Sequence, residues 1–288
     1  MQYLLIQTHK EMETQKEHPV MVPYDFTSVS DVVLTHAGNY CRISNRPLMV
    51  LNIVDNSTRK FLKQQNLVEK NLEAKLEEIC QNLSSKFNIS ASFIIRKTNI
   101  LSIRKIAAEL NISFMFIGID QPQRSASKVL KLIGTSPAPV YVLQGDVEWK
   151  PFKTIIFPVD EFEETRQKIN LVYRLAKLTA TTVKLFSITL NKRDYQINQE
   201  VRVKQIERKL LDNKIPFTTE YAKLKQENFA NELLDYTQAN RGDVLILMKT
   251  PRVYFPNLYI SKFDKKILLN SHNIPSIYIN ARDVETSH

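Results

Sequence analysis

Short apolar runs alternate with stretches of helical periodicity along the chain. The runs are continuous rather than alternating with polar residues, which is typical of parallel strands covered on both faces. Runs of this kind occupy residues 92–95, 114–117 and 244–248. The pattern therefore predicts an α/β protein built on parallel sheets.

The spacing of apolar residues between these runs predicts helices. The i, i+3, i+4, i+7 stripe of a half-buried helix occurs at Ile103, Ile106, Ala107 and Leu110, and again at Ile169, Val172, Tyr173 and Ala176. Ser28 is a suitable N-cap for a helix that ends near residue 40. The remaining helices are expected over residues 59–86, 199–212, 228–240 and 258–270.

The whole pattern repeats after about 135 residues, which indicates a duplicated domain. Residues 20–26 and 155–161 each contain an apolar run that leads into Pro-x-Asp, so that Asp25 and Asp160 correspond. Further matching pairs of runs are 48–54 with 183–189 and 139–142 with 275–278. We therefore predict two domains of five strands and four helices each.

The domain limits follow from the linker. Residues 145–151 contain turn-forming residues and too few apolar positions for an element, so they separate the repeats. The predicted domains are residues 18–145 and 152–281. Met1–Glu17 has no counterpart in the second repeat, and its role stays open between a frayed arm, an added edge strand and a dimer contact.

Each repeat resembles the universal stress proteins, because its first strand leads into Pro-x-Asp and its last strand opens with Pro. The resemblance covers nearly the whole chain twice. It implies the fold of the adenine nucleotide alpha hydrolases, with two five-stranded parallel sheets in the strand order 3-2-1-4-5. It also implies that the last strands of both repeats pair edge to edge, which would form an internal pseudo-dimer and hide two sheet edges.

Many proteins of that family bind ATP, and the resemblance implies where the nucleotide would lie. The adenine side lies by the Asp at the end of the first strand, and the phosphates lie on a loop after the fourth strand. That loop carries Gly, two residues, Gly, nine residues, and Gly-Ser or Gly-Thr. Glycines there let backbone amides approach phosphate oxygens.

The phosphate loop is degenerate in both repeats. The first repeat keeps Gly118 but places Gln121 and Ala126-Ser127 at the other positions of the motif. The second repeat has Met248, Pro251 and Lys262-Phe263 at these positions. The chain contains 5 glycines, far below the average usage of about 7%, so two phosphate cradles cannot be built. A Walker-type loop and a dinucleotide fingerprint are excluded for the same reason.

Five residues stay as candidates for ligand binding. Asp25 and Asp160 end first strands, where open α/β sheets bind ligands, although an Asp there also caps the next helix or turn. Gly118 opens the degenerate loop of the first repeat. Arg124 and Ser127 lie near a predicted helix start, where a small anion could bind or where they could simply cap the helix.

Charge and composition narrow the classes of function. The net charge of +10 permits acidic partners, but residues 202–214 interleave basic with acidic side chains, as a solvated helix face does. This argues against nucleic acid as the partner. No apolar run approaches the roughly 18 residues of a membrane span, and no signal peptide is evident, so we expect a cytoplasmic protein.

No catalytic or metal-binding constellation stands out. Cys41 and Cys80 lie in helical patterns and are expected to be core residues, and the five histidines show no metal-ligand spacing. No Gly-x-Ser-x-Gly elbow is present. We therefore expect neither an enzyme nor a metal site.

The sequence favours a stress-response or regulatory protein that does not bind ATP and acts through a protein partner or an unidentified small ligand. The alternative is an ATP-binding, slowly hydrolysing protein that uses a variant loop around Asp25, Gly118, Arg124 and Ser127. Nucleic-acid binding through the basic surface is a third hypothesis. Association into a homo-oligomer stays open.

Overall fold

Two units form the chain, each built around parallel strands. The computed structural model describes residues 18–98, 102–120, 122–160, 165–224, 226–249 and 261–280. The first unit extends to Asp120 and also includes Ser136–Tyr141 and Gly145–Trp149. The second unit holds the residues from Lys150 onward together with two pieces of the first repeat, Gln121–Thr135 and Val142–Gln144. The units therefore follow the sequence repeats except for these two pieces.

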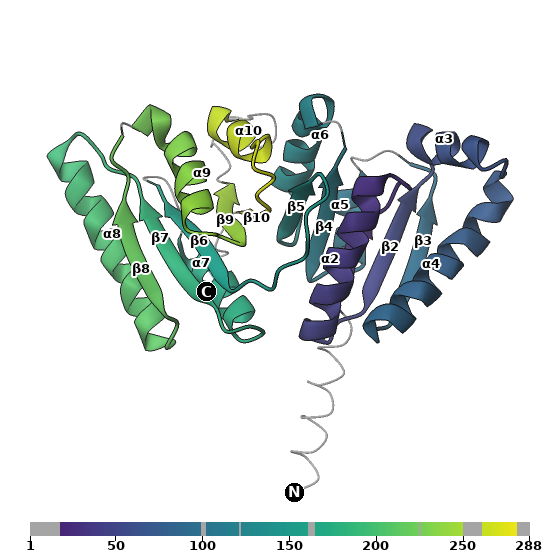
Figure 1. Ribbon diagram of the computed structural model, residues 1–288, viewed down its shortest axis with the longest axis horizontal. Coiled ribbons are helices and arrows are strands. Elements are labelled where there is room, and N and C mark those ends of the chain that lie inside the picture. The colour runs from purple at the N-terminus through teal and green to yellow at the C-terminus, as the bar shows by residue number, and fades with distance from the viewer. Residues whose placement is uncertain are drawn as a thin grey trace, which may run out of the picture. The chain divides into compact units, whose positions relative to one another are not determined.

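The first unit contains the first four strands and their helices (Figure 1). Its strands are β1 (Val20–Pro23), β2 (Leu48–Ile53), β3 (Ala91–Arg96) and β4 (Phe114–Ile119). Its helices are α2 (Ser28–Ser44), α3 (Asn56–Gln64), the 3-10 helix η1 (Glu69–Asn71), α4 (Leu72–Phe87) and α5 (Ile103–Glu109). The strands are parallel, with Val20 of β1 opposite Leu48 of β2 and Phe114 of β4.

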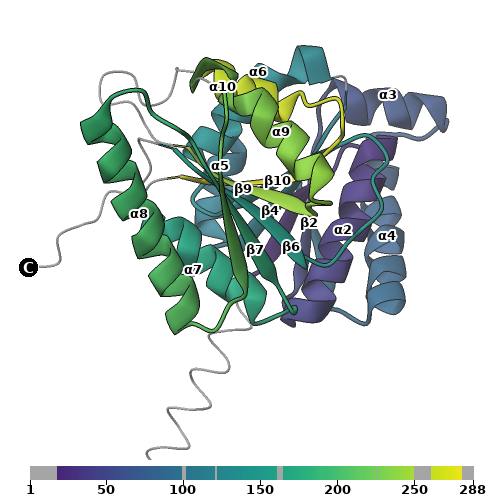
Figure 2. The ribbon, with the colours of Figure 1, turned by 60° about the vertical axis from the view of Figure 1, so that its left-hand side comes forward.

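The second unit repeats this arrangement. Its strands are β6 (Thr154–Val159), β7 (Thr182–Ser187), β8 (Phe217–Tyr221), β9 (Val244–Lys249) and β10 (Ser276–Asn280). Its helices are α7 (Thr165–Ala176), α8 (Arg193–Asp212), the 3-10 helix η3 (Gln226–Asn228), α9 (Phe229–Ala239) and α10 (Lys262–Leu268), with α6 (Pro122–Thr135) added from the first repeat. Figure 2 shows α7 and α8 on one face of the strands and α9 and α10 on the other.

The predicted strand order is confirmed in both repeats. The first repeat has the order β3-β2-β1-β4-β5, where β5 is Val140–Gln144, and the second has β8-β7-β6-β9-β10. Both orders are 3-2-1-4-5 when strands are counted within a repeat. Right-handed crossovers then place the helices on both faces, which is why the central strands are apolar throughout.

Large apolar side chains fill the interior of each unit. In the first unit Tyr40, Phe114, Phe116 and Tyr141 form a chain of ring contacts with centroids 4.7–5.4 Å apart. In the second unit Phe186 stacks on Tyr236 at 4.3 Å. Each such buried side chain contributes roughly 1.5–3 kcal/mol relative to an exposed one. Cys41 and Cys80 are buried, as predicted for core residues.

Three local predictions need correction. The helix expected over 59–86 is interrupted, because Asn66 takes the left-handed conformation (φ 52°) and the chain restarts through η1 into α4. The N-cap of α2 is Thr27 rather than Ser28, since the Thr27 hydroxyl accepts from the Ser30 amide. The run 92–95 belongs to β3, a half-exposed edge strand rather than a buried one.

The predicted C-terminal helix is also shorter than expected. Of residues 258–270, the described part forms α10 from Lys262, and 258–260 lie outside the described residues. Met1–Glu17 likewise lies outside them. Within the described ranges, every helix is too short or too polar to cross a membrane.

Candidate functional site

The carboxyl ends of the first strands form the candidate site, because ligands of open parallel sheets bind at this edge. In the first repeat, β1 is followed by Asp25, whose Oδ1 accepts a hydrogen bond from the Thr27 amide (3.2 Å) and another from the Thr27 hydroxyl (2.7 Å). This carboxylate therefore closes the turn between β1 and α2. Both of these hydrogen bonds use Oδ1 of the carboxylate.

An aromatic group covers the same turn. Phe26 has φ 63°, a left-handed conformation that a bulky residue rarely adopts. Its ring stacks on Phe61 of α3 with centroids 4.0 Å apart, and Tyr24 packs edge-on against it at 4.8 Å. The Tyr24 hydroxyl donates to Asp31 Oδ1 at 2.7 Å, and burial together with this carboxylate raises the tyrosine pKa. The packing of these rings holds the backbone of Phe26 in this strained conformation.

Asn52 is a buried polar residue that the sequence analysis missed. It lies near the end of β2 with no exposed surface, and its Nδ2 donates to the Tyr24 carbonyl (2.8 Å) and to the Thr58 hydroxyl (3.1 Å). Its Oδ1 has no partner among the described residues. A polar residue inside the apolar run 48–53 was the signal that could have revealed it.

Gly118 serves packing in this structure. It lies inside β4, and a Cβ there would approach Val29 Cγ1 to 2.6 Å and Val33 Cγ2 to 2.9 Å. Glycine therefore allows α2 to lie directly on β4. Only two residues separate Ile119, the end of β4, from Pro122, the start of α6, so the described chain offers no extended loop for phosphate at this point.

The other candidates of the first repeat lie in α6. Ser127 is exposed on this helix, and Arg124 belongs to its first turns, with a side chain outside the described residues. Both residues belong to the second unit, whereas Asp25 and Gly118 belong to the first. The structure therefore places the four residues of the predicted variant loop in two units.

In the second repeat, the equivalent strand end is occupied by side chains of the protein itself. Three successive carbonyls, those of Pro158, Val159 and Asp160, each accept a hydrogen bond from a helix side chain. The donors are Lys168 Nζ (2.6 Å), Gln199 Nε2 (2.8 Å) and Arg202 Nη1 (2.7 Å), in the same order. The candidate Asp160 is thus contacted through its backbone by α8.

Two of these donors are bonded to each other, and the third lies in an apolar setting. Gln199 Nε2 also donates to the Ser187 hydroxyl (3.0 Å), and Gln199 Oε1 accepts from Arg202 (3.0 Å). Lys168 has no exposed surface, and its ammonium lies 4.2 Å from the centre of the Phe157 ring. A buried ammonium is costly unless it is paired in this way. The signals in the sequence were a lysine within the apolar stripe of α7 and a glutamine on the buried face of α8.

A second buried lysine lies at the end of β9. Lys249 is 8% exposed, and its Nζ lies 3.6 Å from Asp264 Oδ2 of α10. Gly134 of α6 lies against its aliphatic stem, so that a Cβ added at this glycine would lie 3.1 Å from Lys249 Cε. All three residues belong to the second unit. The pair connects β9 with α10 and so serves the packing of this unit.

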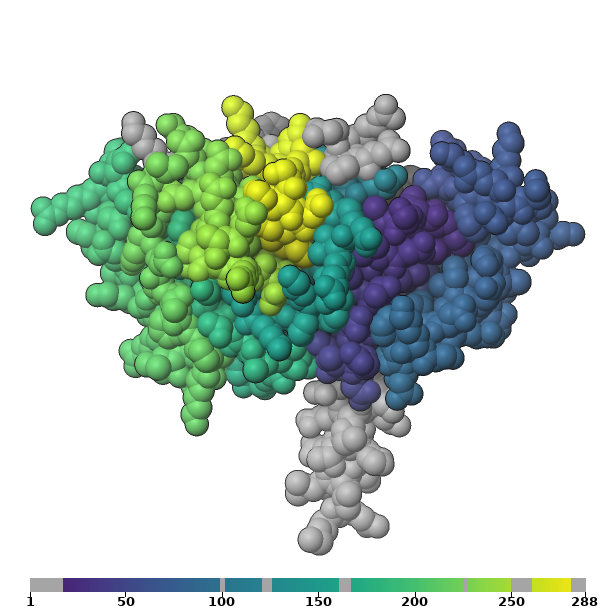
Figure 3. Space-filling model, viewed as in Figure 1, coloured from purple at the N-terminus to yellow at the C-terminus, as the bar shows by residue number. Residues whose placement is uncertain are grey.

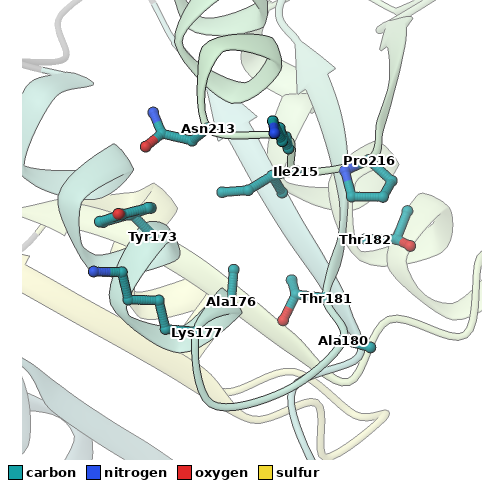
Figure 4. Close-up of a pocket in the computed structure, with 10 residues that line it drawn as sticks. Tyr173, Ala176, Lys177, Ala180, Thr181, Thr182, Asn213, Ile215 and Pro216 are labelled. Carbon is teal, nitrogen blue, oxygen red and sulfur yellow. The ribbon is translucent and has the colours of Figure 1, made fainter.

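A cavity of about 300 Å³ lies elsewhere in the second unit (Figure 4). It is lined from the ends of α7 and α8 and the starts of β7 and β8, with Lys177 and Lys214 as its charged residues. The Lys177 ammonium lies 4.2 Å from the Tyr173 ring centre. Lysines at helix C-termini balance the negative end of the helix dipole, which accounts for both charges without a ligand.

Metal binding and thiolate chemistry depend on the His, Cys, Asp and Glu side chains of the described residues. No group of three His, Cys, Asp or Glu side chains among them is placed to hold a metal ion. Burial raises the pKa of the Cys41 thiol and raises that of Cys80 to about 11, which disfavours a reactive thiolate. His36 is buried and bonded on both ring nitrogens, to the Tyr141 hydroxyl (2.9 Å) and the Val147 carbonyl (2.7 Å).

Comparisons with known proteins give a likeness in structure alone. No family model matches the chain, and no curated protein matches its sequence. A universal stress protein from Archaeoglobus fulgidus DSM 4304 matches with a TM-score of 0.70 and 15% identity, over 93% of this chain and 98% of the other. A candidate universal stress protein from Pseudomonas aeruginosa UCBPP-PA14 matches with a TM-score of 0.62 and 15% identity, over 92% of this chain and 94% of the other.

The fold also occurs in a protein of another kind. The cytoplasmic domain of a prokaryotic cation chloride cotransporter matches with a TM-score of 0.55 and 9% identity, over 91% of this chain and 95% of that domain. Because one fold carries many functions, these matches assign architecture and leave activity to the site. The chain has the tandem α/β fold of the universal stress proteins.

Proposed function

We propose that this chain is a regulatory protein of the universal stress type that does not bind ATP, has no catalytic activity, and acts by binding a protein partner or another small ligand. One observation carries the proposal. In the second repeat, Lys168, Gln199 and Arg202 donate to the three carbonyls at the end of β6. A nucleotide at this edge would have to displace a buried, satisfied network, which is costly.

The first repeat supports the same proposal through its charges and through the short connection between β4 and α6. Asp25, Asp55 and Asp120 follow β1, β2 and β4, so carboxylates line the ends of three neighbouring strands. Like charges repel a triphosphate. The two-residue connection from β4 to α6 also leaves few backbone amides free to approach phosphate oxygens.

Calorimetry tests the proposal directly. The purified full chain is titrated with Mg-ATP up to about 1 mM, and nucleotide is extracted from a second, denatured sample and measured by chromatography. We expect no saturable heat and no co-purified nucleotide. Binding with a dissociation constant in the micromolar range would contradict the proposal, and a double variant, Gln199→Ala with Arg202→Ala, would then show whether the second repeat is the site.

A second candidate function, ATP binding in the first repeat, is favoured by one observation. The Asn52 Oδ1 acceptor is buried beside Tyr24 and has no donor among the described residues, which is uncommon for a buried polar atom. An exocyclic amine of a base could satisfy it. If nucleotide is found, both Asn52→Ser and Asp25→Ala should reduce the amount that is bound. Asn52→Ser introduces the residue type found at the equivalent position 187.

The proposal includes the arrangement of the repeats as an internal pair through their last strands. Three facts within the second unit support it. This unit contains Val142–Gln144 from β5 as well as β10, and the Gln144 side-chain amide donates to the Asn270 carbonyl. Asn280 of β10 also donates to the Ile133 carbonyl of α6 at 2.5 Å. Further association into a homo-oligomer stays a prediction.

A further inference from the structure

The strand β3 pairs on one side only. Among the described strands it ends the sheet of the first unit, next to β2. The carbonyls of Ser90 and Arg96 accept hydrogen bonds from amides at or next to the two ends of β2, so the even-numbered residues of β3 face that strand. Because backbone groups alternate in direction along a strand, the amides and carbonyls of Ala91, Phe93 and Ile95 point outward. We call these three residues the outer edge of β3.

The side chains of β3 do not protect this edge. Phe93, Ile94 and Ile95 are apolar and only half-buried, although α4 packs against the strand. Figure 3 shows α4 in blue at the right-hand side of the surface. The corresponding edge strand of the second unit, β8, has polar residues at its centre, including the exposed Glu220. Proteins usually place charges on a sheet edge or cover it, because an apolar edge invites pairing. The outer edge of β3 therefore needs a cover.

We propose that residues 3–8 of the same chain bind to the outer edge of β3 as an added antiparallel strand. These residues lie outside the described part of the chain. Their sequence, Tyr-Leu-Leu-Ile-Gln-Thr, is a short apolar run without charge, which is typical of a strand. Alternation would place Tyr3 and Leu5 on one face and Leu4 and Ile6 on the other, which matches a strand that is half-buried on both faces. The inference goes beyond the proposed function and does not depend on it.

The position of His18 makes this pairing possible. His18 is the first described residue, and its carbonyl accepts from Arg46 at 3.2 Å at the amino end of the strands. Val20 of β1 and Ala91 of β3 lie in one row through β2, so a strand outside β3 lies three strand spacings, about 15 Å, from β1. Residues 9–17 can span up to about 30 Å. Because the connection starts at the amino end of the sheet, the short path requires an antiparallel strand.

The tether favours this segment over other occupants. A segment linked by a short flexible connection has an effective concentration in the millimolar range, whereas a second copy must bind at the concentration of the protein. Residues 250–260 and 281–288 also lie outside the described residues, but both follow strands of the second unit. The first of these segments contains Pro251 and Pro256, which cannot donate to a ladder, and the second carries several charges.

Amide hydrogen exchange of the full chain, followed by NMR, tests the inference. An added strand would accept hydrogen bonds from outward amides, so we expect the amides of the outer edge of β3 to exchange slowly. The reference amides are the outward ones of the edge strand β8, namely those of Phe217, Thr219 and Tyr221. Exchange at the outer edge of β3 should be about 10-fold slower or more than at these reference amides.

A pair of proline variants identifies the occupant. Adjacent amides of a strand point to opposite sides, so the double variant Leu4→Pro with Leu5→Pro removes a donor toward β3 in any register. Exchange at the outer edge of β3 should then rise to the rate of the reference amides. The matched control is Thr14→Pro with Gln15→Pro in the connection, and it should keep the slow exchange. Slow exchange of the buried β1 amides in both variants shows that the first unit stays folded.

Three results would overturn the inference. The first is an outer edge of β3 that exchanges as fast as the reference amides in the unmodified protein. The second is slow exchange that survives the change of Leu4 and Leu5 to proline. The third is protection that grows with protein concentration over a range of about 100-fold, which would assign the edge to a second copy. None of these results affects the ATP titration, so the two proposals fail separately.

Discussion

The two repeats satisfy the carbonyl at the end of their first strand with different side chains. In the first repeat the Tyr24 carbonyl accepts from Asn52 of the neighbouring strand at 2.8 Å, and in the second the equivalent Val159 carbonyl accepts from Gln199 of α8 at the same distance. Ser187 stands 135 positions after Asn52 and is too short to reach across the strands. A residue from the helix fills the space instead, so the same edge is closed from a different direction.

The first helix of each repeat shows the same divergence. In the first repeat Val33 lies on Gly118, and the helix approaches the strand closely. In the second repeat, Lys168 and Met248 stand at the corresponding positions, and Lys168 reaches the Pro158 carbonyl. Each repeat therefore fills the carboxyl end of its first strand with different residues. The comparison teaches that a glycine or an aspartate at this strand end is not by itself evidence for a bound ligand.

The largest expected effect tests the role of Gly118. Gly118→Ala places a methyl group 2.6 Å from Val29 Cγ1 and 3.2 Å from the Val29 carbonyl, so the helix or strand must shift. We expect a loss of about 2 to 3 kcal/mol in the free energy of unfolding, measured by urea denaturation. Gly134→Ala is the matched control, because its Cβ meets the flexible Lys249 side chain, and it should be neutral or slightly stabilising. Equal stability of both variants would refute the packing role.

A smaller effect tests the closed edge of the second repeat. Gln199→Leu keeps about the same side-chain volume but removes the side-chain donor to the Val159 carbonyl and to the Ser187 hydroxyl, while the Ile188 amide still donates to that carbonyl. We expect a loss of about 1 to 2 kcal/mol, because two buried side-chain hydrogen bonds are lost. Gln205→Leu on the exposed side of the same helix should change stability by less than about 0.5 kcal/mol. If the two variants behave alike, the network does not stabilise this edge.

Most of the fold could be predicted from the sequence, because the duplicated apolar runs mark the strands and the resemblance to the universal stress proteins implies their order. The site could be predicted only in part. Asp25 and Asp160 were found because they end strands, but Lys168, Gln199 and Asn52 look like stray polar residues in apolar patterns until the fold brings them to carbonyls of distant segments. The break at Asn66 was missed because helical periodicity continues across it.

The transfer of α6 to the second unit could not be predicted either. Within the sequence, α6 reads as the fourth helix of the first repeat, and nothing local indicates that its contacts lie with β10 and α10. The assignment of residues to a compact unit depends on contacts between positions far apart in the chain. For example, Asn280 donates to the carbonyl of Ile133, which lies 147 positions earlier.

A pH dependence should distinguish the first repeat from the second. Burial lowers the pKa of His36 below the ordinary value of 6.5, whereas the equivalent residue of the second repeat is Leu171, which does not titrate. As the pH falls, His36 therefore becomes protonated at a higher pH in the unfolded chain than in the folded chain. Neutral His36 therefore contributes its full stabilisation at pH values above its pKa in the unfolded chain. That stabilisation is lost as the pH falls from this pKa to the lower pKa of the folded chain.

We expect the free energy of unfolding to fall by about 1 kcal/mol through this residue between about pH 7.5 and about pH 5.5. In His36→Leu the difference between the two pH values should shrink, although the variant is weaker at both because the Val147 carbonyl loses its donor. His272→Leu changes an exposed histidine and should keep the original difference. An undiminished pH dependence in His36→Leu would place the titrating group elsewhere.

The smallest expected effect concerns Asp25, where the turn and the ligand hypotheses separate. Asp25→Ala removes the acceptor for the Thr27 amide and hydroxyl, and because the site is half-buried we expect a loss of about 0.5 to 1 kcal/mol in thermal or urea unfolding. Asp146→Ala, in an exposed turn, should have a smaller effect. The ATP titration should look the same before and after the change. If stability is unchanged while retained nucleotide disappears, Asp25 acts on a ligand, and the first repeat differs from the second in binding nucleotide.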